Sequence, residues 1–229
     1  PDILSADNIY RHHLGGRELN FEADKKTGHV YTRSKVNSLA RQLQNDLPYI
    51  KVKTKPLYFS EVINDKDLVS CDAIVVAVGA PSVNLQINQE LKDRNFNSVV
   101  FCWNEAAGLG GHSIALNLQV SCYQCLHTDG NQLKAESELS LVCVGQSISK
   151  NLTGCAGVFT PFSFLDSNRT AELAATQTIE ILQSFTTELA ISWKGNNSTN
   201  LKTTDRYATM PLKEQLPLKQ HHDCRVCND

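Results

Sequence analysis

The sequence predicts an α/β fold with a doubly wound, mostly parallel sheet that has a mixed edge. Two short apolar runs, residues 73–78 (AIVVAV) and 97–103 (NSVVFCW), have the length and continuity of strands buried on both faces. Helical patterns over 33–47 and 82–94 alternate with these runs. Strands and helices alternating in this way build a sheet with helices on its faces, and ligands bind at the carboxyl ends of its strands.

The first elements are expected before the first apolar run. Apolar residues recur at helical spacing over 33–47, and Pro48 follows where this helix would end. Residues 51–59 alternate between polar and apolar types and predict a strand. Ser60 is placed to cap a short helix over 61–68.

The second half of the chain is expected to be less regular. Residues 112–120 (HSIALNLQV) alternate like a half-exposed strand, which predicts the mixed edge of the sheet. Residues 126–157 are polar and lack periodicity, so a mobile crossover loop is predicted there. Asp166 or Ser167 can cap a helix that reaches about Phe185. The inner face of that helix would carry Leu173, Ala174, Thr178, Ile179 and Leu182.

Composition restricts the class of partner. The net charge is -2 and charges of both signs are interspersed, which argues against a nucleic-acid partner. No apolar run approaches the roughly 20 residues that a membrane-spanning helix needs, and the first residues lack the order of a signal peptide. The sequence therefore predicts a cytoplasmic protein with no membrane partner.

Four of the eight cysteines form two C-x-x-C pairs, Cys122 with Cys125 and Cys224 with Cys227. Each pair can present two sulfurs to one tetrahedral Zn²⁺ from a tight turn. The long separation between the pairs indicates a metal that joins the chain's end to the sheet edge rather than one that nucleates a small domain. Four protein thiolates leave no open position for a substrate, so the predicted role is structural. The alternative is a set of buried or redox-active cysteines.

Five segments carry motifs in a fixed order: residues 4–12 (LSADNIYRH), 32–36 (TRSKV) and 71–76 (CDAIVV), then Asn88, then residues 154–161 (GCAGVFTP). The first is similar to the D-x-L-S-x-x-N-L-x-R-Q/H segment of the ThiF/MoeB/ubiquitin-activating enzyme superfamily. The second resembles the family's G-x-x-K-A helix start, and the third the strand before its magnesium loop. Asn88 matches the following helix, and the last segment resembles the C-x-x-x-G-V-x-G-P stretch. The zinc pairs lie where the family has them, so the resemblance spans nearly the whole chain and implies a Rossmann-like fold.

This resemblance implies an adenylyltransferase that uses ATP and Mg²⁺. The C-terminal glycine of a ubiquitin-like protein would attack the α-phosphate of ATP, and a thiol would then take the acyl group. By position, Asn8 and Arg11 would contact phosphates, and Lys35 would supply a positive charge near the α-phosphate. Cys155 is the expected acyl acceptor, with Cys143 as the alternative. The plain alternative is that Arg11 and Lys35 are solvated surface charges and Asn8 caps a turn.

Two departures from the family pattern affect the expected activity. The family's glycine-rich loop, its helix and its ribose-binding acid would precede Pro1, so residues 1–229 are expected to form a single domain that lacks its first strand-loop-helix-strand segment. The family's magnesium aspartate falls on Gly79, and no acid lies within residues 73–89. Mg²⁺ would then be held by another residue or chiefly by the phosphates. The other explanation is that adenylation has been lost.

Several hypotheses for the function follow from the resemblance. The main one is an activating enzyme for a ubiquitin-like protein that hands its product to a conjugating enzyme, as a homodimer. The loop sequence looks like the activating portions of bacterial anti-phage conjugation systems. The alternatives are a non-catalytic subunit of an activating enzyme, which Gly79 favours, and a sulfur-carrier-protein adenylyltransferase of the ThiF/MoeB type. An oxidoreductase is disfavoured because the chain lacks G-x-G-x-x-G.

Overall fold

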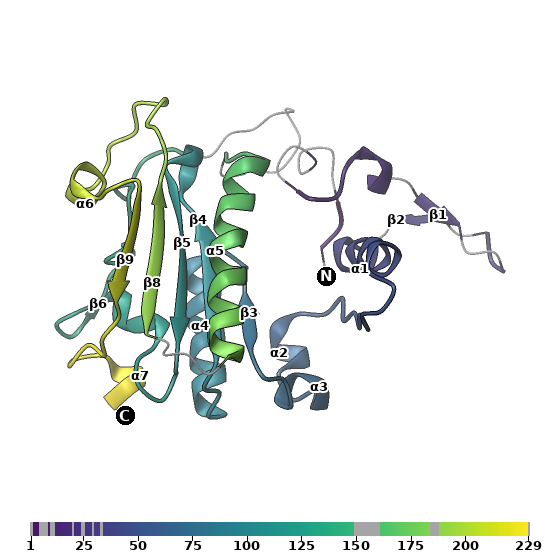
Figure 1. Cartoon of the computed structure of the whole chain (residues 1–229), viewed down its shortest axis with the longest axis horizontal. Helices are drawn as coiled ribbons and strands as arrows, with labels where there is room; N and C mark the ends of the chain where they lie inside the picture. Colours follow the sequence, from purple (N-terminus) through teal and green to yellow (C-terminus); the bar gives the residue numbers. More distant parts are fainter. Residues whose placement is uncertain are drawn as a thin grey trace. The chain divides into compact units, whose positions relative to one another are not determined.

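The computed structural model describes residues 2–4, 9, 12–19, 21–23, 26–28, 30–32, 34–148, 161–183 and 188–228. The chain divides into two compact units, one formed by the first 69 residues and one formed by residues 70–151 and 157–229 (Figure 1). Among the described residues, no helix combines the length and the apolar character needed to cross a membrane.

In the N-terminal unit, the described residues form a short hairpin, a 3-10 turn and three helices. Its elements are η2 (Gly16–Leu19), β1 (Phe21–Ala23), β2 (Val30–Thr32), α1 (Lys35–Asp46), α2 (Phe59–Val62) and α3 (Lys66–Val69). β1 and β2 pair antiparallel. The hydroxyl of Ser34 accepts a hydrogen bond from the backbone N–H of Asn37 and caps α1. The helix predicted over 33–47 is thereby confirmed.

The prediction for residues 51–68 is partly wrong. Residues 51–58 form no strand, and most of their side chains are exposed, so they have no apolar face to pack against a sheet. The expected helix over 61–68 is divided into α2 and α3, and α2 begins after Tyr58 rather than at Ser60. The Glu61 carboxylate accepts a hydrogen bond from the backbone N–H of Tyr58, which fixes this earlier start.

The second unit is built on a five-stranded sheet in the order β3-β4-β5-β8-β9 (Figure 1). The strands are β3 (Ile74–Val76), β4 (Val99–Asn104), β5 (Gly110–Leu116), β8 (Leu189–Lys194) and β9 (Lys213–Pro217). β3 and β4 are parallel, whereas the other neighbouring pairs are antiparallel. The α/β class and the mixed sheet are confirmed, but "mostly parallel" is wrong for the described strands. The doubly wound connectivity stays a prediction.

Helices cover both faces of this sheet. The elements involved are α4 (Pro81–Asp93), η4 (Tyr123–His127) and α5 (Phe164–Leu182). On one face, Val100 packs with Ala174 of α5. On the other face, the ring of Phe101 lies 4.9 Å from that of Tyr123, whose backbone N–H donates to the side chain of Asn88 in α4. Successive strand residues point to opposite faces, so α5 covers one face, and α4 with η4 covers the other (Figure 1).

The positions of β3 and β5 are the reverse of those predicted. β5 lies between two hydrogen-bonded neighbours, and every residue from Gly110 to Leu116 is buried, so the expected half-exposed edge over 112–120 is wrong. β3 was expected to be buried on both faces. It lies at one end of the described sheet, and Val75 is 47% exposed. Both faces of β5 are buried, and each carries a polar residue with a polar partner: His112 with Ser192 on one face and Ser113 with Gln177 on the other.

α5 is confirmed as a long helix, but its cap and inner face differ from the prediction. Ser163 is the cap, and the Asp166 carboxylate accepts a hydrogen bond from the backbone N–H of Ser163, which completes a capping box. The buried face carries Thr170, Leu173, Ala174 and Gln177. Ile179 and Leu182 are more than half exposed, so their expected place in the core is wrong.

Part of the expected mobile crossover over 126–157 has regular structure. Residues Thr128–Asp129 (β6) pair with Gln132–Leu133 (β7), and Leu141 is fully buried. The backbone of Val142 forms an isolated bridge with Thr203. The remaining short elements of the described residues are η3 (Ala106–Gly108), α6 (Asp205–Thr209) and α7 (Arg225–Asn228).

Candidate metal centre and strand-edge site

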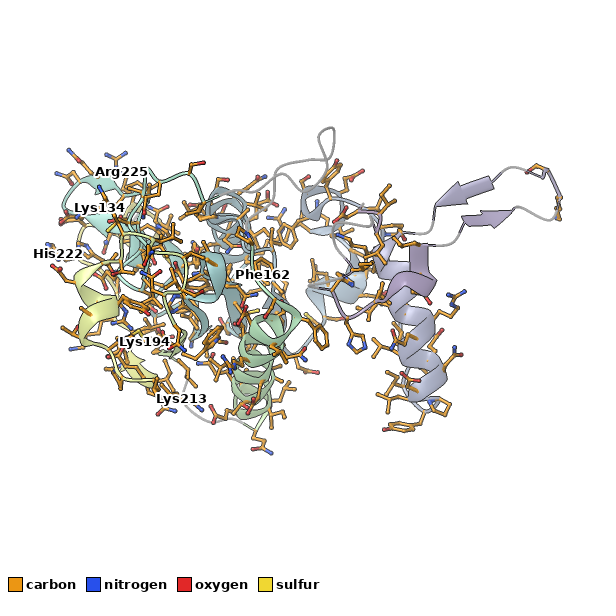
Figure 2. The ribbon with its side chains drawn as sticks, turned by 90° about the horizontal axis from the view of Figure 1, so that it is seen from above. Lys134, Phe162, Lys194, Lys213, His222 and Arg225 are labelled. Carbon is orange, nitrogen blue, oxygen red and sulfur yellow. The ribbon has the colours of Figure 1, made fainter. Side chains whose placement is uncertain are left out.

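The structure brings together the four cysteines of the two C-x-x-C pairs. Cys122 immediately precedes η4 and Cys125 lies within it, whereas Cys224 and Cys227 lie at α7. In each pair the second cysteine donates its backbone N–H to the carbonyl of the first, so each pair occupies a tight turn. His222 and Arg225, labelled in Figure 2, lie on either side of Cys224 along the chain. The turns place all four sulfurs in one cluster.

The sulfur separations have the dimensions of a tetrahedral metal site. The Sγ atoms of Cys122 and Cys125 lie 3.7 Å apart, those of Cys122 and Cys224 3.6 Å, and those of Cys125 and Cys227 3.7 Å. A Zn–S bond of about 2.3 Å in a regular tetrahedron gives a sulfur–sulfur edge of about 3.8 Å. A disulfide would need about 2.05 Å. The donor set therefore fits Zn²⁺ and contains no disulfide among these four residues.

The cluster also favours thiolate at two of its positions. Hydrogen bonding from the Cys122 thiol lowers the pKa of Cys125 to about 7. The Cys122, Cys125 and Cys227 thiols likewise lower the pKa of Cys224. The same hydrogen bonds raise the pKa of Cys122, which acts as the donor. The thiolate is the form of cysteine that binds a metal. A bound cation would therefore replace the thiol protons that form hydrogen bonds between these cysteines.

Lys35 is the one phosphate-binding candidate that lies within the described residues. It opens α1, and its ammonium lies 2.5 Å from the carboxylate of Asp2. Its backbone N–H also donates to the carbonyl oxygen of Asp2. The Asp2 side chain is 74% exposed and that of Lys35 only 20% exposed. An anionic ligand at Lys35 would therefore compete with Asp2 for the ammonium.

The other predicted site residues are placed as follows. Asn8, Arg11 and Cys155 lie outside the described residues. Cys143 is half-buried, and its backbone N–H donates to the carbonyl of Lys202.

A buried polar network that the sequence analysis missed lies at the carboxyl end of β4. The imidazole of His112 is 2.8 Å from the hydroxyl of Ser192 through Nδ1 and 3.2 Å from the carboxylate of Glu105 through Nε2. His112 and Ser192 are almost completely buried. The available signal was a histidine inside the strand-like segment that precedes the apolar run Ile114–Leu116. The network holds the Glu105 carboxylate at the edge of the sheet where the parallel strands end.

Gly79 lies at the same edge. The β3–β4 pairing ends at Val76 and Phe101, and Gly79 follows Val76 by three residues. Gly79 has a φ of +73°, a conformation that glycine adopts without strain. A Cβ at this position would meet the Cβ of Trp103 at 3.9 Å, which is ordinary contact. Position 79 therefore has room for a side chain, but a residue other than glycine would be strained in this left-handed backbone conformation.

Solved structures of MccB are similar to this chain. The complex of E. coli MccB with ATP is 12% identical, with a TM-score of 0.57, over 100% of this chain and 58% of that chain. The complex of E. coli MccB with AMPCPP and MccA is 13% identical, with a TM-score of 0.56, over 100% and 57%. The Microcin C7 biosynthetic enzyme MccB in complex with N-formylated MccA is 13% identical, with a TM-score of 0.57, over 99% and 58%.

The chain has an MccB-like fold. It spans less than two thirds of the length of those MccB chains, and at this identity the likeness shows the fold alone. No protein-family model matches the sequence. A search of curated proteins gave no match.

Proposed function

We propose that the protein catalyses the ATP-dependent adenylation of the C-terminal carboxylate of a ubiquitin-like protein. The observation that carries this proposal is the alignment of the whole chain with MccB, whose solved structures include complexes with ATP and with MccA. The ordered resemblance to ThiF, MoeB and ubiquitin-activating enzymes, together with the clustered cysteines, supports the same chemistry. The substrate is a protein terminus rather than a small molecule.

The proposed reaction has two steps. A carboxylate oxygen attacks the α-phosphorus of ATP, the bond to the β-phosphate oxygen breaks, and pyrophosphate leaves. A thiol then attacks the acyl carbon, and AMP leaves with the bonding electron pair. Charge neutralisation on the triphosphate is the main requirement of the first step. Lys35 supplies a fixed positive charge from the start of α1, and Mg²⁺, when bound, neutralises phosphate charge.

We assign the acyl-accepting thiol to Cys155 and keep Cys143 as the alternative. Residues 154 and 157 are glycines, so they carry no side chain that would hinder an acyl chain at Cys155. In the intact protein with ATP and its ubiquitin-like partner, a reductant-sensitive adduct should form and should disappear in Cys155→Ala. An adduct that persists in Cys155→Ala and disappears in Cys143→Ala moves the assignment to Cys143. If the wild type forms no adduct, transfer proceeds without an enzyme thioester.

The four clustered cysteines would hold one structural Zn²⁺. They supply four thiolates to one ion, which leaves no position for a substrate. The metal joins η4, which packs on the sheet through Tyr123, to the α7 segment. We further propose a cytoplasmic homodimer that transfers its product to a conjugating enzyme.

A second candidate function is a non-catalytic subunit of an activating enzyme, because Gly79 places no carboxylate at the end of β3. A third is a sulfur-carrier adenylyltransferase of the ThiF/MoeB type. The three readings differ in measurable ways. A non-catalytic subunit would not exchange pyrophosphate by itself, whereas a sulfur-carrier enzyme would exchange it without forming an enzyme thioester.

Isotope exchange between pyrophosphate and ATP in the full-length protein tests the proposal. We expect exchange that depends on the ubiquitin-like partner and that falls strongly in Lys35→Ala. Lys51→Ala removes an exposed lysine of the same unit and should leave exchange unchanged. Asp2→Asn should tighten ATP binding by about 1.4- to 5-fold, because an exposed ion pair is worth about 0.2–1 kcal/mol and would no longer compete. Exchange at the wild-type rate in Lys35→Ala would show that Lys35 has no role at the α-phosphate.

A further inference from the structure

A cavity of about 600 Å³ is lined by residues of both C-x-x-C turns. Its volume lies within the range of roughly 300–1,000 Å³ that is usual for ligand sites in proteins. The end of α4 and the β6–β7 hairpin form the rest of the wall. The lining includes Lys92 and Asp93 of α4, Gln124 of η4, Gln132 and Leu133 of β7, and Arg225 of α7.

The cavity lies far from the carboxyl edge of the parallel strands. α4 begins at Pro81, shortly after the end of β3, and its last residues, Lys92 and Asp93, line the cavity. A helix rises about 1.5 Å per residue, so the length of α4 separates the two places by about 20 Å. A ligand in the cavity is therefore different from any ligand that binds at the carboxyl edge.

The two carboxylates in the lining already have hydrogen-bond partners. The side-chain amide of Gln89 donates to the carboxylate of Asp93 at 2.8 Å. The Nε2 atom of His222 lies 2.9 Å from the carboxylate of Asp223. Because each carboxylate has a polar partner, the lining does not select for a cationic ligand.

The lining also contains two cations, Lys92 and Arg225. The ammonium of Lys92 donates to the backbone carbonyl of Leu118 at 2.5 Å. Arg225 is exposed, and in the part of the chain that the structure describes no residue bonds to its guanidinium (Figure 2). A guanidinium can bind a carboxylate through two parallel hydrogen bonds. The free charge of the cavity therefore favours a ligand that carries a carboxylate.

The remaining polar groups of the cavity match the main chain of a peptide. Gln124, Asn131 and Gln132 each present a side-chain amide to which no described residue bonds. An amide side chain offers both donors and an acceptor, as a peptide group does. Leu133, which is 55% exposed, and Val226 add apolar surface to the same lining. The cavity therefore fits a short peptide that has an apolar and an acidic side chain.

We propose that this cavity binds an acidic peptide segment of a protein partner. Arg225 pairs with a carboxylate of the segment, and the amides of Gln124 and Gln132 bind its peptide groups. Gln124 lies in one C-x-x-C turn and Arg225 in the other, so the clustering of the four cysteines brings these two parts of the wall together. The inference goes beyond the proposed function, because binding at this cavity requires neither ATP nor turnover.

The test compares two peptides that differ only in one carboxylate. The probes are acetyl-Ala-Leu-Glu-Ala-amide and acetyl-Ala-Leu-Gln-Ala-amide, titrated into the full-length protein by isothermal calorimetry. Wild type should bind the glutamate peptide at least about 5-fold more tightly than the glutamine peptide, because a bidentate pair exceeds the range of a simple exposed ion pair.

Variants of Arg225 separate direct pairing from a structural role. Arg225→Ala should bind the two peptides equally, because the preference for the carboxylate is lost with the guanidinium. Arg225→Lys keeps the charge without the fork and should show an intermediate preference. A merely structural role would weaken both peptides and keep their ratio. Lys213→Ala removes an exposed cation of β9 that lies away from Arg225 in Figure 2, and it should bind both peptides as wild type does.

Gln132→Ala provides a second arm outside the cysteine turns. Gln132 is exposed in β7, so its replacement leaves the cysteine cluster intact even if Arg225→Ala does not fold. The loss of one hydrogen bond to the main chain should weaken both peptides by about 2- to 10-fold. The preference for the glutamate peptide should stay as in wild type.

Several results would overturn the inference. They are the absence of saturable binding of the glutamate peptide to wild type, equal binding of the two peptides by wild type, a preference that persists in Arg225→Ala, and unchanged binding of both peptides by Gln132→Ala. Inorganic phosphate that displaces the glutamate peptide and binds more tightly would also overturn it, because the cavity would then be a phosphate site. Pyrophosphate exchange should proceed in Arg225→Ala as in wild type, so failure of the proposed function is observed separately.

Discussion

Replacing one cysteine of the proposed metal centre should destabilise the protein by an amount set by the length of chain that the bound metal would close into a loop. Cys224→Ser removes a fully buried sulfur that lies 3.6 Å from Cys122, and these two residues are 102 positions apart. The chain-entropy relation assigns about 4.7 kcal/mol to a crosslink over a loop of about 100 residues. For a protein of this size, 1 kcal/mol shifts the thermal midpoint by about 2–4 °C. We therefore expect the midpoint of Cys224→Ser to fall by about 10 to 20 °C.

Elemental analysis and thermal unfolding together test this expectation. Wild type purified without chelator should carry about one Zn²⁺ per chain, and Cys224→Ser should carry much less. A chelator should lower the midpoint of wild type and leave that of Cys224→Ser unchanged. Cys71→Ser alters a half-buried cysteine outside the cluster and should keep both metal and midpoint. The reasoning is refuted by wild type that holds no metal, or by Cys224→Ser with an unchanged midpoint.

Two further predictions concern the sheet. Gly111→Ala should lower the free energy of unfolding by about 1–3 kcal/mol, because the new Cβ would lie 2.1 Å from Thr170 Oγ1, which accepts the hydrogen bond of Trp193 Nε1. Gly15→Ala is the control, because a Cβ at position 15 would meet no atom within 4 Å. In denaturant unfolding, the stability of Gly15→Ala should lie within about 0.5 kcal/mol of wild type. Burial raises the pKa of Cys102 from 9.0 to about 11, so the neutral thiol stabilises the fold below pH 9 and this contribution is lost as the pH rises towards 11. Between pH 8 and 10.5, wild type should lose about 2 kcal/mol more than Cys102→Ala in urea unfolding, and equal losses would contradict the raised pKa.

Local signals in the sequence identified the helices better than the strands. The helices α1 and α4 have periodic apolar residues and a proline at one end, and both lie within about two residues of their predicted bounds. β3 and β5 were assigned to the wrong environments because burial of a strand depends on its neighbours. One of the two partners of β5 is β8, which lies about 80 residues away in the register of His112 with Ser192. No local pattern reveals such a pairing.

The residues of the candidate site were likewise predicted only where the signal is local in the sequence. The spacing of the cysteine pairs predicted the four clustered sulfurs, since each C-x-x-C turn is a local structure and two such pairs match the ligand set of one tetrahedral Zn²⁺. The buried network of His112, Ser192 and Glu105 was missed because His112 and Ser192 lie on strands far apart in the sequence and meet only after β5 and β8 have paired. The roles of Lys35 and Cys155 stay predictions.

The two tryptophans of the chain make its two layers separately observable. Trp103 lies on the face covered by α4 and η4, with its ring 5.7 Å from Tyr123, the residue that directly follows Cys122. Trp193 lies on the α5 face, where its indole N–H donates to Thr170. Fluorescence from a variant that keeps only Trp103 would therefore report on the environment of the turn that carries Cys122 and Cys125. A variant that keeps only Trp193 would report on the packing of α5. Comparing the fluorescence of the two variants during unfolding would show which face of the sheet loses its packing first.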